Sequence, residues 1–332
     1  MHNSFVTVSL ISDPLFLPQT QEGQVLHIIS CNPDEPEEIK MIRNHSVAVI
    51  GGDMRQFAIY ERLLLQNNDV VLCAFEKSGF LGRHTSQPIC RDALYGADIV
   101  ILPLPAFIQG KLNAPFSDEN VTFDTLFRII PKSAKVFGGK IDKSCVEAAE
   151  KSGFVINDYM KREDFAVMNA VPTAEGALAV SIENTDGTIM GSRVLICGYG
   201  RIGKILSRRF HLLGADVTVS ARKPEDLSWI AAYSMKPIKT DELFYTELDF
   251  DIIVNTVPYM IFNKKLISHV KNGCVMIDLA SLPGGIDLDA ANSMGIKAVR
   301  ALSLPGKTAP AAAGRIILST IENMLYETEM SK

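Results

Sequence analysis

The sequence predicts an α/β protein with two doubly wound parallel-sheet lobes in tandem, an inter-lobe helix and a C-terminal crossover helix. From Ser46 onward, apolar strands alternate with helical patterns, as in the βαβ units that build parallel sheets. The pattern also occurs twice, because the interval from Gly51 to Asp69 equals the interval from Gly198 to Asp216. The length of 332 residues suits two domains of roughly 150 residues each.

Each segment has a pattern that supports this order. In the first lobe we expect a strand over 47–50, a helix over 56–65 and strands over 69–75 and 97–102. In the second we expect a strand over 194–197, a helix over 202–213 and strands over 216–220 and 250–255. The predicted divisions are a loosely attached arm (1–45), a first lobe for the substrate (46–170), a nucleotide-binding lobe (171–303) and a C-terminal segment (304–332).

Two helices are expected to connect the lobes. Pro172 and Thr173 resemble a helix start, because proline suits the first helical position, and one apolar face follows them. The last helix is expected over 309–326, and we expect it to pack back onto the first lobe.

Composition and charge exclude several functional classes. The chain has 33 basic and 38 acidic residues, a net charge of −5, and no block of Lys or Arg. We therefore expect neither a nucleic-acid partner nor an anionic membrane surface. No apolar run approaches the roughly 18 residues of a membrane span, and the first twenty residues lack a basic segment.

The cysteines and histidines predict no disulfide framework and no metal site. The six cysteines form no C-x-x-C pair, and Cys73, Cys197 and Cys274 lie in apolar strand-like runs that suggest core positions. No cluster of His, Cys and carboxylates has metal-ligand spacing. A reduced, cytoplasmic protein without a metal is expected.

The clearest motif is Gly198-x-Gly200-x-x-Gly203, which follows an apolar strand and opens a helix. In a Rossmann-type nucleotide site the first glycine allows a tight turn, the second lets the backbone approach the pyrophosphate, and the third lets helix and strand pack closely. The motif predicts dinucleotide binding. The residues expected to complete this site flank the glycines and follow the next inner strand: Arg201, Ile202, Thr256, Val257 and Pro258.

The end of the second strand favours NADP over NAD. An NAD site usually has an acidic residue there, which binds the ribose 2′-hydroxyl. Here the segment contains Ser220, Arg222 and Lys223, which can donate hydrogen bonds to a 2′-phosphate. A solvated loop is the alternative interpretation of these two cations.

The first lobe lacks the nucleotide features, so we expect it to bind substrate. Asp53 and Gln56 occupy the positions of the second and third glycines. Arg55, at a helix start where a cation is disfavoured unless an anion binds there, is a candidate clamp for a substrate carboxylate. The equally weighted alternative is a surface arginine paired with Asp53. Gly52 and Asp53 are further candidates for the substrate site.

Loops rich in Gly and Pro should supply the other side of the substrate site. They carry Ser281 and Gly284 after one strand, and Lys307 near the final crossover. Lys307 could bind a second carboxylate or take part in proton transfer. Thr173 and Glu175 could face the same site. Glu175, Asp278 and Lys307 are all candidates for the general base, and the sequence does not rank them.

Four segments together resemble the A subunit of dipicolinate synthase, a family from spore-forming bacteria. They are Val47-Ala-Val-Ile-Gly-Gly-Asp-x-Arg55, Val171-Pro-Thr-Ala-Glu-Gly176, Asp278-Leu-Ala-Ser-x-Pro-Gly-Gly285 and Leu304-Pro-Gly-Lys-x-Ala-Pro310. The resemblance covers about residues 41–327 and leaves out the N-terminal arm.

This resemblance implies an enzyme of the sporulating mother cell that oxidises a dihydrodipicolinate-type intermediate of lysine biosynthesis to dipicolinate, with NADP⁺ accepting the hydride. It also implies that the partner is a flavoprotein-like B subunit. In that scheme Arg55 and Lys307 bind the two carboxylates. A homo-oligomer is also expected.

Two other functions stay open. Two-lobed 2-hydroxy-acid dehydrogenases share the architecture but use an Arg after a late strand and a His near the final crossover, where this chain has Ser281 and Lys307. The other is a non-catalytic NADP-binding subunit whose partner performs the chemistry.

Overall fold

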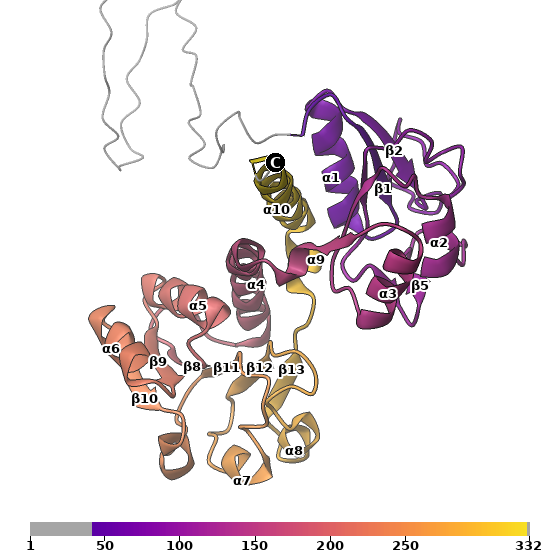
Figure 1. Cartoon of the computed structure of the whole chain (residues 1–332). Helices are drawn as coiled ribbons and strands as arrows, with labels where there is room; N and C mark the ends of the chain where they lie inside the picture. The colour runs from indigo at the N-terminus through magenta and orange to yellow at the C-terminus, as the bar shows by residue number, and fades with distance from the viewer. Residues whose placement is uncertain (1–41, 331–332) are drawn as a thin grey trace, which may run out of the picture. The chain divides into compact units, whose positions relative to one another are not determined.

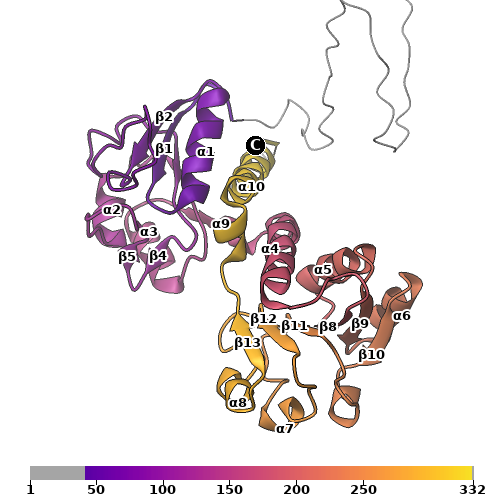
Figure 2. The same cartoon turned by 180° about the vertical axis from the view of Figure 1, so that it is seen from behind.

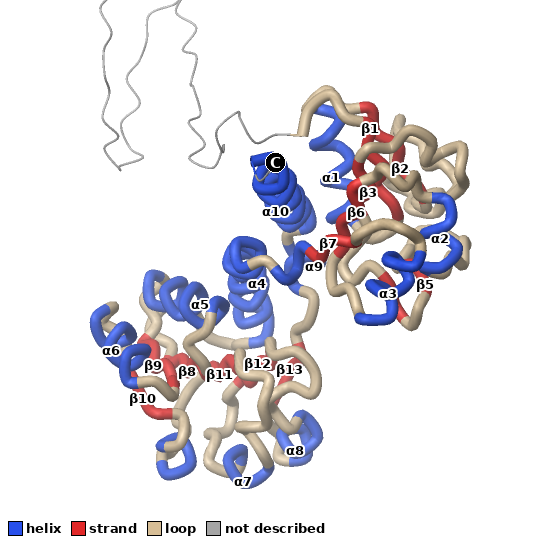
Figure 3. The backbone as a smooth tube through the Cα atoms, viewed as in Figure 1, coloured by secondary structure: helices blue, strands red, loops and turns tan. Residues whose placement is uncertain are grey.

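The computed structural model describes residues 42–330 of the chain, so the predicted arm over 1–45 lies almost entirely outside the described residues. Within the described part, two parallel sheets follow one another along the chain and are flanked by helices (Figures 1 and 3). The predicted fold class is confirmed.

The first lobe is a five-stranded parallel sheet with the strand order β2-β1-β3-β6-β7. This is the 2-1-3-4-5 order of flavodoxin-like folds, in which ligands bind where the strand order reverses. Its strands are β1 (Ser46–Ile50), β2 (Asp69–Cys73), β3 (Ile99–Ile101), β6 (Lys135–Gly138) and β7 (Ile156–Asp158), with a small antiparallel pair, β4 (Phe107–Ile108) and β5 (Lys111–Leu112). Its helices are α1 (Met54–Leu65), α2 (Phe123–Ile129), α3 (Lys143–Lys151) and the 3₁₀ turn η2 (Tyr159–Lys161).

The second lobe is a six-stranded parallel sheet with the order β10-β9-β8-β11-β12-β13. This is the 3-2-1-4-5-6 order of dinucleotide-binding folds. Its strands are β8 (Arg193–Cys197), β9 (Asp216–Ala221), β10 (Lys236–Lys239), β11 (Ile252–Asn255), β12 (Val275–Asp278) and β13 (Lys297–Arg300). Its helices are α5 (Arg201–Leu212), α6 (Pro224–Ala232), α7 (Lys264–Ile267), α8 (Leu288–Ser293) and the 3₁₀ turn η3 (Glu242–Tyr245).

Three further helices connect the lobes: α4 (Glu163–Asn184), the short α9 (Leu304–Thr308) and α10 (Pro310–Met330). Helix α10 packs against α1, and α4 packs against α5, as the two opposite views show (Figures 1 and 2). Ile317 and Ile321 of α10 belong to the same apolar core as Val47 and Phe57 of the first lobe. The expected return of the last helix to the first lobe is therefore confirmed.

The predicted start of the inter-lobe helix is wrong. Helix α4 does not start at Pro172 but at Glu163, and the proline lies inside it. An internal proline removes one backbone hydrogen bond, but here buried apolar residues on both sides of it, including Phe165 and Ala174, pack on the helix and outweigh that cost. The C-terminal helix begins at Pro310 and is preceded by the separate turn α9, which the sequence pattern did not distinguish.

Helix α4 also has the length and apolar composition that a membrane span would need, alone among the helices within 42–330. Core helices of soluble proteins have the same properties, and α4 packs against α5, α9 and α10.

Candidate active site

Each of the three glycines of the motif Gly198-x-Gly200-x-x-Gly203 has a separate steric role. Gly198 has a φ of +98°, and a Cβ there would lie 2.5 Å from Thr256 Oγ1 and 2.7 Å from Val257 Cγ2. A Cβ on Gly203 would lie 2.1 Å from the carbonyl oxygen of Gly198. A Cβ on Gly200 would meet nothing within 4 Å. The turn and the helix contact therefore exclude side chains, while the middle glycine faces open space.

The N-terminus of α5 has backbone donors available for an anion. Gly200 is the N-cap residue, no side chain caps the helix, and its first turn contains no acidic residue. Exposed N–H groups and the helix dipole at such an end bind phosphate groups. These features fit a dinucleotide pyrophosphate. Arg201 is held by Glu163 of α4, with Nε 2.8 Å from Oε1, and Ile202 packs against the core of the lobe.

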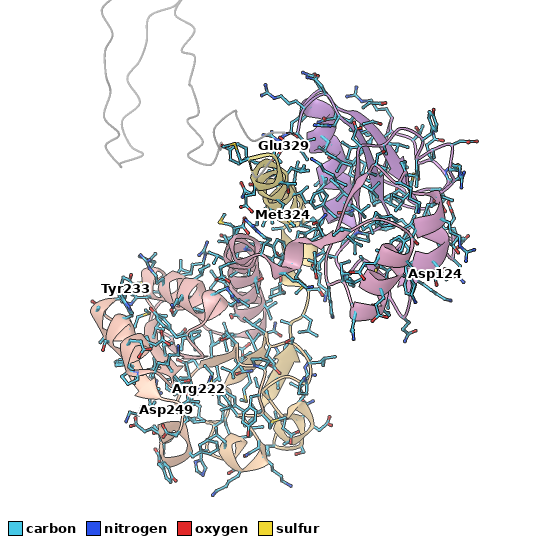
Figure 4. The ribbon with its side chains drawn as sticks, in the orientation of Figure 1. Asp124, Arg222, Tyr233, Asp249, Met324 and Glu329 are labelled. Carbon is cyan, nitrogen blue, oxygen red and sulfur yellow. The ribbon has the colours of Figure 1, made fainter. Side chains whose placement is uncertain are left out.

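The three residues predicted to contact a 2′-phosphate differ in exposure at the end of β9. Ser220 is completely buried, and its hydroxyl donates to Cys197 Sγ over 3.2 Å, so we leave its side chain out of the phosphate site. Arg222 and Lys223 follow the strand and are exposed, and Lys223 is the N-cap of α6 (Figure 4 labels Arg222). The first carboxylates come later, in the first turn of α6.

Thr256, Val257 and Pro258 follow β11 directly, at the edge where the glycine turn lies. The Thr256 hydroxyl donates to the carbonyl of Cys197 over 2.9 Å, which ties the end of β11 to the end of β8. With Gly198 packed against Thr256 and Val257, the predicted cofactor residues of both strands come together in the structure.

Asp278 is buried and holds the loop that follows β12. Its Oδ1 accepts from Asn255 Nδ2 at 2.8 Å, and its Oδ2 accepts from the backbone N–H of Gly285 at 3.0 Å. Arg300 Nη2 lies 3.5 Å from the same Oδ2. A carboxylate with these bonds cannot accept a proton from a ligand without releasing the loop. The geometry therefore assigns Asp278 to positioning Ser281 and Gly284, which lie in this loop.

Asn255 and Arg300 complete this network, and neither is among the site residues predicted from the sequence. The Arg300 Nε is buried without a hydrogen-bond partner in the described part of the chain, and its side chain remains 27% exposed. The pairing register of β11, β12 and β13 brings these residues together. It places Asn255 opposite Asp278, and Asp278 opposite Arg300.

In the first lobe, the protein's own carboxylate occupies the place that an anion would take. Asp53 caps α1 by accepting from the backbone N–H of Arg55 at 3.0 Å. The Arg55 Nε donates to Asp53 at 2.9 Å, and Nη2 donates to the carbonyl of Leu104 at 2.7 Å. The pairing with Asp53 is present, but the Arg55 side chain is only 13% exposed, so it is not a surface ion pair. Gly52, with a φ of +91°, packs against Gln56 and Pro103.

Helix α9 brings several predicted substrate residues close to one another. A Cβ on Gly306 would lie 3.1 Å from Arg55 Nε and 3.2 Å from Asp53 Oδ2, and exposed Lys307 follows that glycine. A Cβ on Gly176 of α4 would lie 2.9 Å from Leu304 of α9. The short helix α9 therefore lies against both Arg55 and the middle of α4, and it carries Lys307.

Two residues of α4 have local partners. The Thr173 hydroxyl donates to the carbonyl of Asn169, 2.7 Å away and one helical turn earlier. Glu175 accepts from Arg209 of α5 at 2.8 Å and is half exposed. Within residues 42–330 no group of His, Cys, Asp and Glu could hold a metal ion.

Comparison with known proteins gives the family. Over 294 residues the chain is 36% identical to the dipicolinate synthase A subunit of Bacillus subtilis (strain 168), an alignment that covers 87% of this chain and 98% of that protein. The chain belongs to the family of dipicolinate synthase A subunits. Residues 46–160 match the model of the N-terminal domain of this family, so the resemblance seen in the sequence is confirmed.

Residues 171–281 match the NAD-binding domain of D-isomer specific 2-hydroxyacid dehydrogenases. The crystal structure of the dipicolinate synthase A chain from Bacillus subtilis superposes with a TM-score of 0.76 at 34% identity, covering 89% of this chain and all (100%) of that one. The dipicolinate synthase A subunit from Bacillus halodurans gives 0.76 at 32% identity, with coverages of 86% and 99%. This family member is thus an oxidoreductase of the NAD(P)-dependent class with a nicotinamide-dinucleotide domain.

Proposed function

We propose that this chain is the A subunit of a dipicolinate synthase, which oxidises a dihydrodipicolinate-type ring to pyridine-2,6-dicarboxylate with NADP⁺. The observation that carries the proposal is the 36% identity to a named dipicolinate synthase A subunit over 98% of that protein. The match covers 87% of this chain, more than either lobe alone, so it includes residues of the substrate lobe as well as the nucleotide lobe.

The NADP preference is supported by the end of β9. Arg222 and Lys223 are exposed directly after the strand, and no carboxylate stands at its end to bind a 2′-hydroxyl or repel a 2′-phosphate. In this proposal Gly198, Gly200 and Gly203 accommodate the pyrophosphate, and the two cations bind the 2′-phosphate.

The substrate is a small dicarboxylate, and Arg55 and Lys307 are proposed to bind its carboxylates. Arg55 already uses Nε and Nη2 for Asp53 and Leu104, so Nη1 is the edge that it presents to a ligand. Gly52, Thr173, Ser281 and Gly284 would line the remainder of this site.

The reaction removes one hydride and one proton from the ring. Bound NADP⁺ would supply the hydride acceptor. Of the three candidates for the proton acceptor, Asp278 is committed to its loop and Glu175 to Arg209. Lys307 Nζ has no hydrogen-bond or ion-pair partner in the described part of the chain. We therefore assign proton removal to Lys307.

The family name supports a two-subunit enzyme. The proposed partner is a flavoprotein-like B subunit, and the proposed setting is the cytoplasm of the mother cell in a sporulating bacterium. A homo-oligomer of this chain is part of the same proposal.

A coupled assay tests the function directly. Freshly prepared dihydrodipicolinate and NADP⁺ are mixed with this chain, with and without the B subunit, and NADPH and pyridine dicarboxylate are followed together. Equal yields of the two products support the proposal. Tight NADPH binding without turnover, even with B present, would instead favour a non-catalytic subunit. Turnover of 2-hydroxy acids would favour the dehydrogenase alternative, whose cofactor-domain model matches residues 171–281.

Variants test the individual roles. Arg222→Asp should reverse the preference between NADPH and NADH, while Arg83→Asp, an exposed arginine of the first lobe, should not. If Arg55→Ala leaves substrate affinity unchanged, the assignment of Arg55 to a carboxylate is wrong.

A further inference from the structure

A pocket lies on the second lobe, between α5 and α6, where neither the cofactor nor the substrate is proposed to bind. Its volume is about 410 Å³, within the range of small-molecule sites. The two helices run beside one another in both views (Figures 1 and 2). The lining side chains come from the two helices and from the glycine turn: Tyr199, Lys204, Ile205, Arg208, Arg209, Leu212, Trp229 and Tyr233. We call it the α5–α6 pocket.

Aromatic rings form one side of the α5–α6 pocket. Trp229 of α6 and Tyr233, the C-cap residue of this helix, are stacked, with ring centroids 5.7 Å apart and planes 23° from parallel. Trp229 is 56% exposed, although large aromatic side chains usually bury most of their surface. Figure 4 labels Tyr233 on this part of the second lobe. The exposed part of the Trp229 ring suits another flat ring.

Cations form the other side. The Arg208 guanidinium carbon lies 4.8 Å from the centroid of Tyr233, and Lys204 Nζ lies 5.5 Å from that of Tyr199. Neither cation has an ion-pair partner among residues 42–330, and a guanidinium over a ring keeps its N–H edges available. Arg209 is neutralised by Glu175. Burial raises the pKa of Tyr199, and Asp226 at longer range adds to that rise.

We propose that the α5–α6 pocket binds a planar aromatic carboxylate, with its ring against Trp229 and its carboxylate facing Arg208 and Lys204. Stacking alone would accept a neutral ring, and the cations alone would accept any anion. Only a ligand with both properties satisfies both sides of the pocket. This proposal rests on the pocket itself and does not depend on the reaction proposed above.

A ligand in this pocket should also affect the conformation of the glycine turn at Gly198–Gly200. Tyr199 stands between Gly198 and Gly200 and lines the pocket at the same time. A ligand that fixes the Tyr199 ring therefore acts on the backbone that approaches the pyrophosphate.

The test uses a property that the sequence supplies. The chain contains 1 tryptophan, Trp229, so its fluorescence reports on this pocket alone. Pyridine-2,6-dicarboxylate is titrated into the full-length protein without cofactor, with excitation at the red edge of the tryptophan band. Two matched compounds are titrated in parallel. Cyclohexane-1,3-dicarboxylate keeps the charges without a flat ring, and pyridine-2,6-dicarboxamide keeps the ring without the charges.

We expect saturable quenching by pyridine-2,6-dicarboxylate and much weaker effects of the two matched compounds. Arg208→Gln should raise the dissociation constant about five- to tenfold, the loss expected for one cationic contact. Arg208→Lys should recover part of it. Arg83→Gln, which changes an exposed arginine of the first lobe by the same chemistry, should leave binding unchanged.

Four results would overturn the proposal. They are the absence of saturable quenching, equal effects of all three compounds, equal binding by Arg208→Gln and wild type, and loss of the Trp229 signal in Arg55→Ala. The last would place the ligand in the substrate site. If the B subunit perturbs Trp229 while no small compound does, the surface is a protein interface and binds no small ligand.

Discussion

The glycine turn of the second lobe allows one substitution to be tested in two places with opposite consequences. Gly200 and Gly203 stand three positions apart in the same turn and helix. We predict that Gly200→Ala weakens dinucleotide binding and leaves stability nearly unchanged, whereas Gly203→Ala destabilises the folded lobe. The difference follows from what each new methyl group would meet.

At Gly203 the methyl carbon would lie 2.1 Å from the backbone carbonyl oxygen of Gly198 and 2.9 Å from its carbonyl carbon. A backbone atom cannot rotate away as a side chain can, so β8 and α5 must separate. Overpacking of this kind costs about 1–3 kcal/mol, and a clash with backbone belongs at the upper end of that range. At about 2–4 °C per kcal/mol for a domain of roughly 150 residues, the melting temperature of the second lobe should fall by about 6–12 °C.

At Gly200 the methyl group would meet nothing within 4 Å, and the backbone already has φ −77° and ψ −166°, which alanine adopts freely. Alanine is a poorer N-cap than glycine by roughly 0.5 kcal/mol, while its smaller unfolded-state entropy returns about 0.4–1 kcal/mol. These effects nearly cancel. The methyl group does occupy the space through which the pyrophosphate reaches the backbone, so affinity should fall about 10- to 100-fold, or about 1.4–2.8 kcal/mol.

Thermal unfolding by circular dichroism and titration with NADPH fluorescence measure the two quantities on the same samples. Gly187→Ala is the matched control, because its methyl group would also meet nothing within 4 Å and it lies outside the turn. The reasoning is refuted if Gly200→Ala binds NADPH like wild type, or if Gly203→Ala melts at the wild-type temperature.

Three further predictions concern buried polar groups and thiols. Asp278→Asn places an amide where a carboxylate accepts hydrogen bonds from Gly285 and Asn255. It should lower the free energy of unfolding by about 2–3 kcal/mol and the melting temperature by about 5–10 °C. Asp287→Asn changes a helix cap in the same loop region and should cost less. Burial raises the pKa of Glu322, so the folded state holds a proton more tightly than the unfolded state and stability falls as pH rises above the ordinary Glu pKa of about 4.3. Glu322→Gln, whose Oε1 can still accept from Ile42 and Gln66, should flatten that pH dependence and melt relatively higher at neutral pH; parallel curves for variant and wild type would contradict this. Burial also raises the pKa of four thiols to about 12: Cys73, Cys145, Cys197 and Cys274. When the native protein is alkylated at mildly alkaline pH and its peptides are mapped, Cys90 should be modified first among the described cysteines. Rapid modification of Cys197 would count against the structure.

The order of strands and helices could be predicted because local signals agree with the fold. Apolar runs such as the one ending at Cys197 are continuous, as expected for strands covered on both faces, and Gly198 marks the turn that follows. The start of α4 could not be predicted. Pro172 is a strong local signal for a boundary, but the cost of a proline inside a helix was outweighed by tertiary packing that no local pattern displays.

In the candidate site, too, local features could be predicted from the sequence and features that depend on distant strands could not. The roles of Gly198, Gly200 and Gly203 follow from spacing, because backbone geometry in a turn is a local property. The commitment of Asp278 to its loop depends on strands that are distant in sequence, and so does the burial of Ser220 against Cys197. Sequence reasoning could name these side chains as polar groups at strand ends. It could not show that their hydrogen bonds are already used within the protein.

The first βα units of the two lobes differ in how the N-terminus of the helix is capped. In each lobe the first strand ends in a positive-φ glycine and a helix follows. In the second lobe Gly200 caps the helix without a side chain, and the donors remain open to a phosphate. In the first lobe Asp53 caps the helix with its own carboxylate and Arg55 neutralises it. A bound anion would have to displace the Asp53 carboxylate from the helix N-terminus, so this cap opposes the binding of a pyrophosphate. It also keeps Arg55 beside α9.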